Sequence, residues 1–484
     1  MNSLKFGTSG LRGLVTDLTG RPSFAYAAAF FASVGAEPGM RREVVIGRDL
    51  RASSAGIAAT VATAAAAAGL TAIDCGPLPT PALALEAARR GSLAVMVTGS
   101  HIPDDRNGLK FYRPDGEITK ADEAAILGAL GDIADPAPLP PAVPAEPEPD
   151  AIARYRRRYL DVLAPDILAG LTIAVYQQSS VARDVLVDVL LALGADAVPI
   201  GRSETFVPID TEAHRPQDVA FIREAMASGA FDALVTTDGD ADRPLVADAR
   251  GRILRGDVLG LITARYLGAD AVVVPVTAGS AIERAGGFRR VLRTRVGSPF
   301  VIAGMERAAR DGARIVCGFE ANGGFLVGSD SPVGDGAGRK VLPALPTRDA
   351  VLPILATLAA ARQAGLPLAD LVAALDVGET ASDRLPDTPS ERSGAFLRRL
   401  AEEAFRRDFL RPVGQPHGVD EQDGVRIGLD GDRTIHFRAS GNAPELRCYA
   451  EAKSARDAEE LVRWGLAAAA AAMGRTACSG PSRG

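Results

Sequence analysis

The sequence predicts a soluble protein built from several α/β domains, with a smaller α+β domain at its C-terminal end. Short apolar runs of strand length alternate with longer helical patterns along most of the chain. This alternation is typical of α/β units whose largely parallel strands are buried on both faces. The length of 484 residues corresponds to about three or four domains at roughly 100–200 residues each.

The individual elements follow from these runs in chain order. Helices are expected over 54–69 and over a segment that ends near Gly194, since both show helical spacing of apolar residues. Near the C-terminus, 425–427 and 434–437 are expected to be strands between helical patterns, which is typical of an α+β domain. Further strands are predicted at 43–47, 93–97, 172–176, 233–236, 271–274 and 314–317.

Proline usage indicates the clearest domain boundary. Seven of the 32 prolines fall between Pro136 and Pro149, and a stretch of this kind is extended and cannot continue a helix. A turn at 249–251 and the break at 385–389 suggest two further boundaries. The predicted domains are therefore 1–145, 150–255, 256–375 and 380–474.

Composition restricts the classes of function. Hydrophobic residues make up 47% and charged residues 24% of the chain, and the net charge is −6. These values fit a soluble globular protein without the basic field that nucleic acid requires. Neither a membrane span nor a signal peptide is expected, so we predict a cytoplasmic location. The cysteines are too dispersed for a disulfide framework and are expected to be reduced: Cys75, Cys317, Cys448 and Cys478.

A candidate nucleophile follows the strand at 93–97. The sequence Thr98–Pro103 presents Ser100 and His101 in a loop between glycine and proline. It is not the G-x-S-x-G elbow of a serine hydrolase, because Thr98 and Ile102 occupy the glycine positions. His101 is the immediate neighbour of Ser100, which is poor geometry for a base acting on that serine. An ordinary surface loop would have the same sequence, so this hexapeptide alone does not establish function.

The segment Asp238–Arg243 is a stronger signal. Asp238, Asp240 and Asp242 follow an apolar strand at alternate positions, and their charges repel unless a cation neutralises them. Carboxylate oxygens suit Mg²⁺, which keeps positions open for phosphate oxygens. A calcium loop is excluded, since its sixth and twelfth positions would be Arg243 and Ala249. A solvated acidic turn is the alternative interpretation.

Three further segments could bind anions or hydroxyl groups. Residues 7–13 combine small residues with Arg12, and residues 438–444 form a turn of small residues with Arg447 close by. Free backbone N–H groups and guanidinium groups of this kind bind phosphate. In 318–324, Glu320 and Asn322 could bind sugar hydroxyls, although an ordinary turn is equally compatible with that segment.

Taken in order, these segments resemble the α-D-phosphohexomutases, the family of phosphomannomutases, phosphoglucomutases and phosphoglucosamine mutases. The resemblance extends from Phe6 to about Glu451. It implies three similar α/β domains with mixed or parallel sheets and a smaller C-terminal α+β domain around a central cleft. It assigns Ser100 as the phosphoserine and as a metal ligand beside Asp238, Asp240 and Asp242. Catalytic roles fall to Arg12, His101, Lys110 and Arg243, and substrate binding to Glu320, Asn322, Arg438, Ser440, Gly441, Asn442 and Arg447.

The chain also departs from the family pattern. The family usually has alanine at Gly99 and asparagine at Ile102. At the positions of the family's sugar loop, this chain has Phe319 in place of a glycine and Asn322 in place of a serine. Ser298 stands where a histidine is expected, and Asn442-Ala443 replaces a Thr-Glu pair. The serine and the three aspartates are retained, so these differences bear on sugar preference and leave the chemistry in place.

The resemblance implies a mutase that interconverts hexose 6-phosphate and hexose 1-phosphate, with mannose preferred and glucose also accepted. The cofactors would be Mg²⁺ and hexose 1,6-bisphosphate, and the enzyme would be a monomer or a homodimer. Phosphoglucosamine mutase is the alternative within the family. A metal-dependent sugar phosphatase and a non-catalytic sugar-phosphate sensor are the alternatives outside it.

Overall fold

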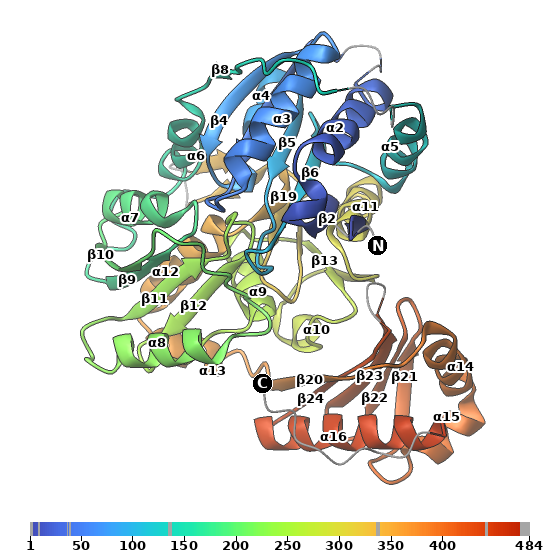
Figure 1. Ribbon diagram of the computed structural model, residues 1–484. Coiled ribbons are helices and arrows are strands. Elements are labelled where there is room, and N and C mark those ends of the chain that lie inside the picture. The colour runs from blue at the N-terminus through green and yellow to red at the C-terminus, as the bar shows by residue number, and fades with distance from the viewer. Residues whose placement is uncertain are drawn as a thin grey trace. The chain divides into compact units, whose positions relative to one another are not determined.

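The computed structural model describes residues 3–7, 10–35, 37, 40–133, 138–334, 339–440 and 444–474. The chain divides into two compact units, each described here by itself. The larger unit comprises Met1–Val273, Phe288–Leu292 and Gly297–Ala374, and the smaller unit comprises Val274–Gly287, Arg293–Val296 and Leu375–Gly484. Several sheets with flanking helices confirm the multi-domain α/β fold (Figure 1).

The first sheet has the strand order β1-β2-β6-β5-β3-β4-β8, with β7 paired to β6. The predicted helix at 54–69 is α3, and it packs against α2 and β3. Its alanines permit this close approach, and most of the helix is buried. The elements are β1 (Lys5–Gly7), β2 (Gly10–Leu14), α1 (Val15–Leu18), α2 (Arg21–Ser33), β3 (Glu43–Arg48), α3 (Ser54–Ala67), β4 (Thr71–Pro77), α4 (Thr80–Arg90), β5 (Leu93–Val97), β6 (Arg106–Arg113), β7 (Gly116–Glu117), α5 (Lys120–Ile133) and β8 (Glu146–Pro147).

The second sheet has the order β10-β9-β11-β12. Strand β9 is parallel to β10 and β11, whereas β12 is antiparallel to β11, with Thr237 opposite Pro244. The acidic segment 238–243 is therefore a tight connection between two antiparallel strands. The elements are α6 (Ala151–Leu160), β9 (Thr172–Gln178), α7 (Arg183–Ala192), β10 (Asp196–Arg202), α8 (Pro216–Met226), β11 (Ala233–Thr237) and β12 (Pro244–Asp248).

In the third sheet, β13, β15, β16 and β19 pair in that order. The predicted strand at 314–317 begins two residues later, because the N–H groups of Arg314 and Ile315 donate to the carboxylate of Asp270. The elements are α9 (Gly256–Tyr266), β13 (Ala271–Pro275), α10 (Ala281–Ala285), β14 (Arg290–Thr294), α11 (Ser298–Arg310), β15 (Val316–Phe319), β16 (Phe325–Val327), β17 (Ser331–Val333), β18 (Lys340–Leu342), β19 (Leu345–Asp349), α12 (Val351–Ala364) and α13 (Leu368–Ala373).

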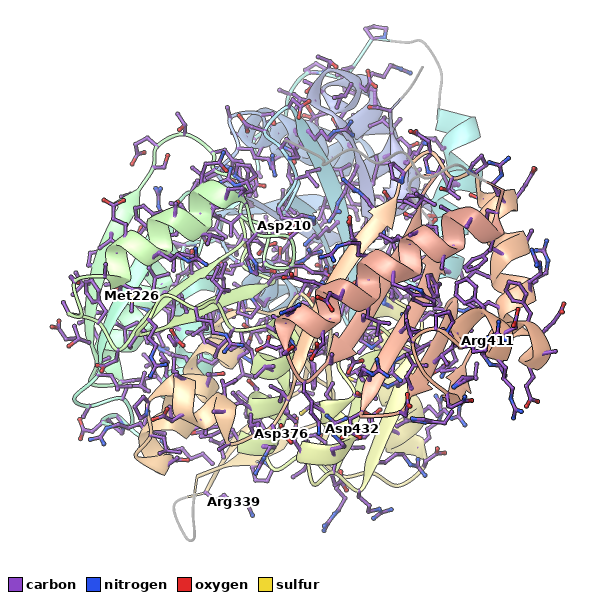
Figure 2. The ribbon with its side chains drawn as sticks, turned by 90° about the horizontal axis from the view of Figure 1, so that it is seen from below. Asp210, Met226, Arg339, Asp376, Arg411 and Asp432 are labelled. Carbon is purple, nitrogen blue, oxygen red and sulfur yellow. The ribbon has the colours of Figure 1, made fainter. Side chains whose placement is uncertain are left out.

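The smaller unit contains an antiparallel sheet of order β20-β24-β23-β22-β21. Its long helix α16 lies across the strands (Figure 2) and is capped at its N-terminal end by Ser454, whose side chain accepts the N–H of Asp457. Strand β20 escapes sequence-based prediction because its residues are mostly polar and exposed. The elements are β20 (Glu379–Leu385), α14 (Ser390–Ala401), α15 (Glu403–Leu410), β21 (Pro416–Asp420), β22 (Val425–Leu429), β23 (Arg433–Ala439), β24 (Leu446–Ala452) and α16 (Ala455–Ala472).

Two smaller expectations can be checked as well. Cys75, Cys317 and Cys448 are buried free thiols, as predicted, whereas Cys478 lies outside the described residues. Among the helices that the structure describes, none is both long and apolar enough to cross a lipid bilayer.

Candidate active site

Ser100 lies in the loop between β5 and β6 and is almost completely buried. Its Oγ donates a hydrogen bond to Oδ2 of Asp238 at 2.5 Å. Its backbone φ is +56°, in the left-handed region that non-glycine residues seldom adopt. Such a conformation costs about 1–3 kcal/mol and persists only where surrounding contacts enforce it.

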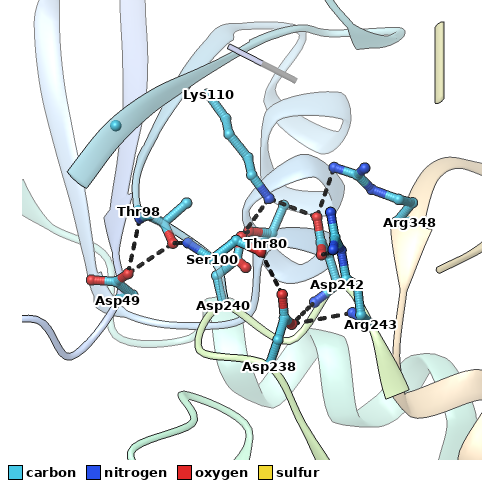
Figure 3. A network of polar contacts seen from close by, with 12 residues as sticks. Asp49, Thr80, Thr98, Ser100, Lys110, Asp238, Asp240, Asp242, Arg243 and Arg348 are labelled. Carbon is cyan, nitrogen blue, oxygen red and sulfur yellow. Dashed lines mark hydrogen bonds and ion pairs between the residues drawn. The ribbon is translucent and has the colours of Figure 1, made fainter. Parts of the chain in front are cut away.

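Asp49 supplies the first of these contacts. Its Oδ2 accepts the hydroxyl of Thr98 at 2.8 Å, and the Thr98 hydroxyl in turn accepts the N–H of Ser100 at 2.8 Å. Figure 3 shows this chain of bonds. Burial raises the pKa of Asp49, whereas the charge of Arg51 and the hydrogen bonds from Ser54 and Thr98 oppose that shift. The carboxylate of Asp49 therefore orients the backbone that carries Ser100.

Arg51 supplies the remaining contacts. Its guanidinium pairs with Asp49 at 3.1 Å and lies 3.8 Å from the ring centroid of Phe206. A guanidinium offers five donors in a rigid plane, and here it is directed at the loop. It donates to the carbonyl oxygens of Ser100 (3.1 Å), Ile102 (2.5 Å), Pro103 (2.8 Å) and Arg106 (3.1 Å).

Asp238, Asp240 and Asp242 form one buried cluster, each with no measurable exposure. One oxygen from each lies within 4.8 Å of the others. The connection that carries them is braced from within, because Oδ1 of Asp238 accepts the N–H groups of Asp242 and Arg243, each at 3.2 Å. A hydrogen bond from α4 also holds this connection, since the carbonyl of Asp240 accepts the N–H of Thr80 at 2.9 Å.

Lys110 faces this cluster from β6. Its Nζ lies 2.6 Å from Oδ2 of Asp240 and 2.6 Å from Oδ2 of Asp242 (Figure 3). Oδ2 of Asp240 also accepts the hydroxyl of Thr80 at 2.5 Å. The ammonium thus neutralises part of the negative charge that the strand connection concentrates.

The cluster still has the donor set that a divalent cation requires. Burial, followed by the charges of Asp240 and Asp242, raises the pKa of Asp238 well above its ordinary value. Oδ1 of Asp240 and Oδ1 of Asp242 are buried and accept no hydrogen bond from any residue that the structure describes. Nε of Arg243 lies 3.6 Å from Oδ1 of Asp242, which is beyond hydrogen-bond distance. Buried carboxylate oxygens that accept no hydrogen bond, contributed by a group of three acids, fit a hard divalent ion.

Cationic and imidazole groups surround Ser100. Burial, reinforced by the charges of Arg243 and Arg348, lowers the pKa of Arg12 to about 10. Burial, followed by Arg243, lowers the pKa of His101 to about 2. His101 is therefore neutral, with its Nδ1 3.3 Å from the Ser100 Oγ. A phosphate on Ser100 would face a field of fixed positive charge.

The segment 318–324 lies in the same unit and is held by neighbouring elements. Nη1 of Arg348 donates to Oε2 of Glu320 at 3.2 Å. The carbonyl of Asn322 accepts the hydroxyl of Thr211 at 2.8 Å, while its Oδ1 accepts the N–H of Gly324 at 3.0 Å. Asn322 therefore fixes its own turn and retains an amide N–H₂ group that can meet a ligand.

The smaller unit holds the predicted phosphate-binding residues. Nε of Arg438 lies 2.9 Å from Oδ1 of Asp423, and Nε of Arg447 donates to Oε1 of Glu445 at 2.8 Å. The N–H of Ser440 donates to the carbonyl of Glu445 at 3.0 Å. Gly441 and Asn442 lie outside the described residues.

Most of the predicted site residues converge in the larger unit. Contacts or charge interactions connect the Ser100 loop, the aspartate cluster and the segment 318–324. The residues brought together are Arg12, Ser100, His101, Lys110, Asp238, Asp240, Asp242, Arg243 and Glu320. Asn322 lies in the same turn as Glu320, and its own contacts are with Thr211 and Gly324.

Known proteins resemble this chain along nearly its full length. Residues 3–135 match the family model for the α/β/α domain I of phosphoglucomutase/phosphomannomutase, and residues 255–376 match that for domain III. A phosphomannomutase of Sinorhizobium fredii is 47% identical over 471 residues, 96% of this chain and 98% of that protein. The chain belongs to the phosphoglucomutase/phosphomannomutase family. The resemblance seen in the sequence is thereby confirmed, and the protein is a phosphohexomutase.

Other members of the family show how far the similarity extends. A phosphomannomutase of Salmonella muenchen is 40% identical over 98% of this chain and 97% of that protein. A phosphoglucosamine mutase of Desulforudis audaxviator is 30% identical over 95% of this chain and 97% of that protein. A solved structure of a phosphoglucomutase/phosphomannomutase family protein from Burkholderia thailandensis has a TM-score of 0.75 at 19% identity, covering 97% of each chain. It shows the same fold.

Two arginines of this phosphohexomutase were not selected from the sequence. Arg51 lies shortly after β3 in the run 48–51, and Arg348 is the penultimate residue of β19 in the run 347–349. Polar residues at the end of a strand or shortly after it were the available signal, and the same signal led to Ser100 and the aspartates. Neither run contains a spacing specific enough to separate a site residue from a solvated turn.

Proposed function

We propose that this enzyme interconverts mannose 6-phosphate and mannose 1-phosphate, and the corresponding glucose phosphates, through a phosphoserine at position 100. The observation that carries the proposal is the 2.5 Å hydrogen bond between the Ser100 Oγ and Asp238 in the buried aspartate cluster. This bond supports a nucleophilic role for Ser100, because its hydroxyl lies against an acid cluster that can hold a divalent cation. Mannose is favoured because relatives that are 47% and 40% identical to this chain are phosphomannomutases.

The chemistry consists of two phosphoryl transfers. In the first, the bond between phosphorus and the Ser100 oxygen breaks and a bond to the free sugar hydroxyl forms, which gives a hexose 1,6-bisphosphate. In the second, the bond between the other phosphorus and its sugar oxygen breaks and a bond from that phosphorus to the Ser100 oxygen forms. The sugar oxygen leaves as a hydroxyl, which gives the product and restores the phosphoserine. Catalysis of such transfers rests on positioning and on neutralising charge. We assign that purpose to Arg12 and Arg243, because the charges of both act on His101, the neighbour of Ser100.

We assign proton transfer at the sugar oxygens to Lys110, which would accept the proton of the attacking hydroxyl as the neutral amine and return it, as the ammonium seen beside Asp240 and Asp242, to the sugar oxygen that departs in the second transfer. An efficient general base has a pKa near the working pH, whereas the pKa of His101 is about 2. His101 is therefore a weak proton acceptor, and we assign it a hydrogen bond to the Ser100 oxygen. Lys110 extends from β6, and its Nζ lies beside the carboxylates of Asp240 and Asp242.

Mg²⁺ is the cation we propose, held by Asp238, Asp240, Asp242 and the oxygen of Ser100. When bound it would neutralise charge on the transferred group. In the smaller unit we assign recognition of the phosphate that does not react to Arg438, Ser440, Gly441, Asn442 and Arg447. Glu320 and Asn322 would bind sugar hydroxyls.

The domain boundaries 1–145, 150–255, 256–375 and 380–474 remain a proposal, in which each domain contributes one segment to the reaction. The cytoplasmic location and the monomeric or homodimeric state remain predictions from the sequence. The substrate is a small phosphosugar in every case.

The test is a competition assay with mannose 1-phosphate, glucose 1-phosphate and glucosamine 1-phosphate, each at equal concentration with Mg²⁺. We expect mannose 6-phosphate to form fastest, glucose 6-phosphate second, and little inorganic phosphate. Preference for glucosamine 1-phosphate would indicate a phosphoglucosamine mutase. Release of inorganic phosphate in place of a 6-phosphate would indicate a phosphatase and would overturn the proposal.

A further inference from the structure

Arg348 is a buried cation at the end of β19, and its side chain is only 2% exposed. It is among the largest fully buried side chains of the residues that the structure describes. Burying a guanidinium is costly unless acidic partners surround it. The identity and arrangement of those partners therefore show what the residue does.

The two nearest partners belong to different parts of the site. Nη2 of Arg348 lies 2.8 Å from Oδ2 of Asp242, a candidate metal ligand, as Figure 3 shows. Nη1 lies 3.2 Å from Oε2 of Glu320, the candidate sugar-binding acid. One planar group therefore holds two carboxylates that come from separate loops.

A third acid also lies near Arg348. Oε1 of Glu117 lies 3.9 Å from Nη2 of Arg348, and its Oε2 accepts the hydroxyl of Ser298 at 2.6 Å. Ser298 is the position where the family pattern led us to expect a histidine. A buried cation thus lies close to a position at which this chain carries a neutral hydroxyl group.

The segment 318–324 leaves room for the arginine. A Cβ at Gly324 would lie 2.7 Å from Cδ of Arg348, so any larger residue there would displace the side chain. The strand end itself is fixed, because Asp349 accepts the hydroxyls of Tyr155 at 2.9 Å and Tyr159 at 2.5 Å. The guanidinium is therefore presented from a rigid support.

We propose that Arg348 is a positioning residue that couples sugar recognition to phosphoryl transfer. It orients the Glu320 carboxylate toward the sugar and the Asp242 carboxylate toward the cation. The inference rests on the proposed function, since it gives Glu320 and Asp242 their assigned tasks. Lysine would not replace Arg348, because an ammonium is a point charge without the rigid fork that meets two carboxylates together.

The test compares Arg348→Lys and Arg348→Gln with Arg158→Lys. Arg158 is also buried and donates to the carbonyl of Pro343 at 2.8 Å, and within the part of the chain that the structure describes no hydrogen bond or ion pair joins it to a site residue. The measurements are KM and kcat for mannose 1-phosphate and glucose 1-phosphate, the Mg²⁺ dissociation constant by calorimetry, and the thermal midpoint. The calorimetric measurement requires no turnover.

We expect Arg348→Lys to fold with a thermal midpoint close to that of Arg158→Lys. Its KM and its Mg²⁺ dissociation constant should both rise by about ten-fold to a hundred-fold, the range for losing a hydrogen bond to a charged group. Selectivity between the two sugars should decrease. Arg158→Lys should change none of these, and Arg348→Gln should be at least as impaired as Arg348→Lys.

If KM, sugar selectivity and Mg²⁺ affinity were unchanged in Arg348→Lys, lysine would fully replace arginine and the inference would be overturned. Equal effects in Arg158→Lys would assign Arg348 a purely structural role and overturn it as well. If the wild-type protein converted no hexose phosphate, the proposed function would fail. The Mg²⁺ affinities would then decide separately whether Arg348 orients Asp242.

Discussion

The Ser100 Oγ donates a hydrogen bond to Oδ2 of Asp238 across 2.5 Å, although the two residues are 138 positions apart in the chain. One lies after β5 of the first sheet and the other after β11 of the second. Two sheets therefore cooperate to place a hydroxyl group against a buried acid. This relationship makes the serine more than an ordinary loop residue.

Replacing any one aspartate of the cluster by asparagine should impair cation binding. Asp238→Asn, Asp240→Asn and Asp242→Asn each remove one negative charge from the oxygen donor set. We expect kcat to fall by about a hundred-fold or more and the Mg²⁺ needed for half-maximal activity to rise. Steady-state kinetics over a Mg²⁺ titration measures both.

Removal of the metal provides the control for those variants. Dialysis of the wild-type enzyme against a chelator should abolish turnover, and added Mg²⁺ should restore it. Asp248, which caps the turn after β12, is a matched acid outside the cluster, so Asp248→Asn should keep the wild-type Mg²⁺ dependence. Full activity of the chelated wild-type enzyme would contradict the metal assignment.

Arg51→Lys should slow catalysis without weakening sugar binding. Lysine keeps a positive charge beside Asp49 but cannot donate to four carbonyl oxygens at once. Since Arg51 holds the left-handed backbone at Ser100, we expect kcat to fall by about a hundred-fold, the typical cost of a small misplacement. KM for the hexose phosphate should change little. A large rise in KM with unchanged kcat would contradict this role.

Gly99→Ala should disturb the same support. A Cβ at Gly99 would lie 2.8 Å from Cζ of Arg51, and the guanidinium is too firmly bonded to move aside. Overpacking of this kind costs about 1–3 kcal/mol, which chemical denaturation can measure. In a double-mutant cycle with Arg51→Lys the two effects should be less than additive. Strict additivity would show that Gly99 and Arg51 act independently.

Substitutions at Lys110 and His101 should have unequal effects. Lys110→Met removes the group assigned to proton transfer, which is worth about 10²–10⁴-fold in rate. His101→Gln should cost less than about ten-fold, because a neutral imidazole with a pKa of about 2 contributes little as a base. The pH–rate profile of His101→Gln should keep its wild-type shape between about pH 5 and 8. Loss of a limb from that profile would assign the proton to His101.

Sequence patterns predicted the buried strands of the larger unit well, because continuous apolar runs at 93–97 and 233–236 have few other structural solutions. They also identified Ser100 and the aspartates, since both sets directly follow such strands. Strand β20 was missed because it has no continuous apolar run: its residues are mostly polar, and they form a strand by pairing with β24. No local pattern records that pairing.

Arg51 and Arg348 could not be selected from the sequence, because their importance lies in what they contact. Arg51 meets carbonyl oxygens about 50 residues away, and Arg348 meets Asp242 and Glu320. Backbone carbonyls have no side-chain signature, and an isolated arginine after a strand is common on protein surfaces. Tertiary packing alone turns these residues into buried supports.

The stability of the smaller unit should depend on pH through His436. Burial lowers the pKa of His436 to about 4, below its unfolded value of about 6.5. The unfolded state therefore binds more protons between these values, so stability is full above about pH 6.5 and falls as pH decreases toward 4. The largest loss is about 3 kcal/mol. Calorimetric unfolding of the full chain from pH 7 to pH 4 measures it.

His436→Gln should flatten that pH dependence, because glutamine does not titrate. His417→Gln, at an exposed position on β21 of the same sheet, should leave the dependence unchanged. An equally steep fall in both variants would place the titrating group elsewhere.

The most direct measurement is the intact mass of the purified enzyme after incubation with hexose 1,6-bisphosphate, compared with Ser100→Ala. The wild-type protein should carry one phosphate group, located at Ser100 by peptide fragmentation. Ser100→Ala should carry none and should show no turnover, while still binding Mg²⁺. A phosphate on another residue, or turnover by Ser100→Ala, would contradict the phosphoserine mechanism.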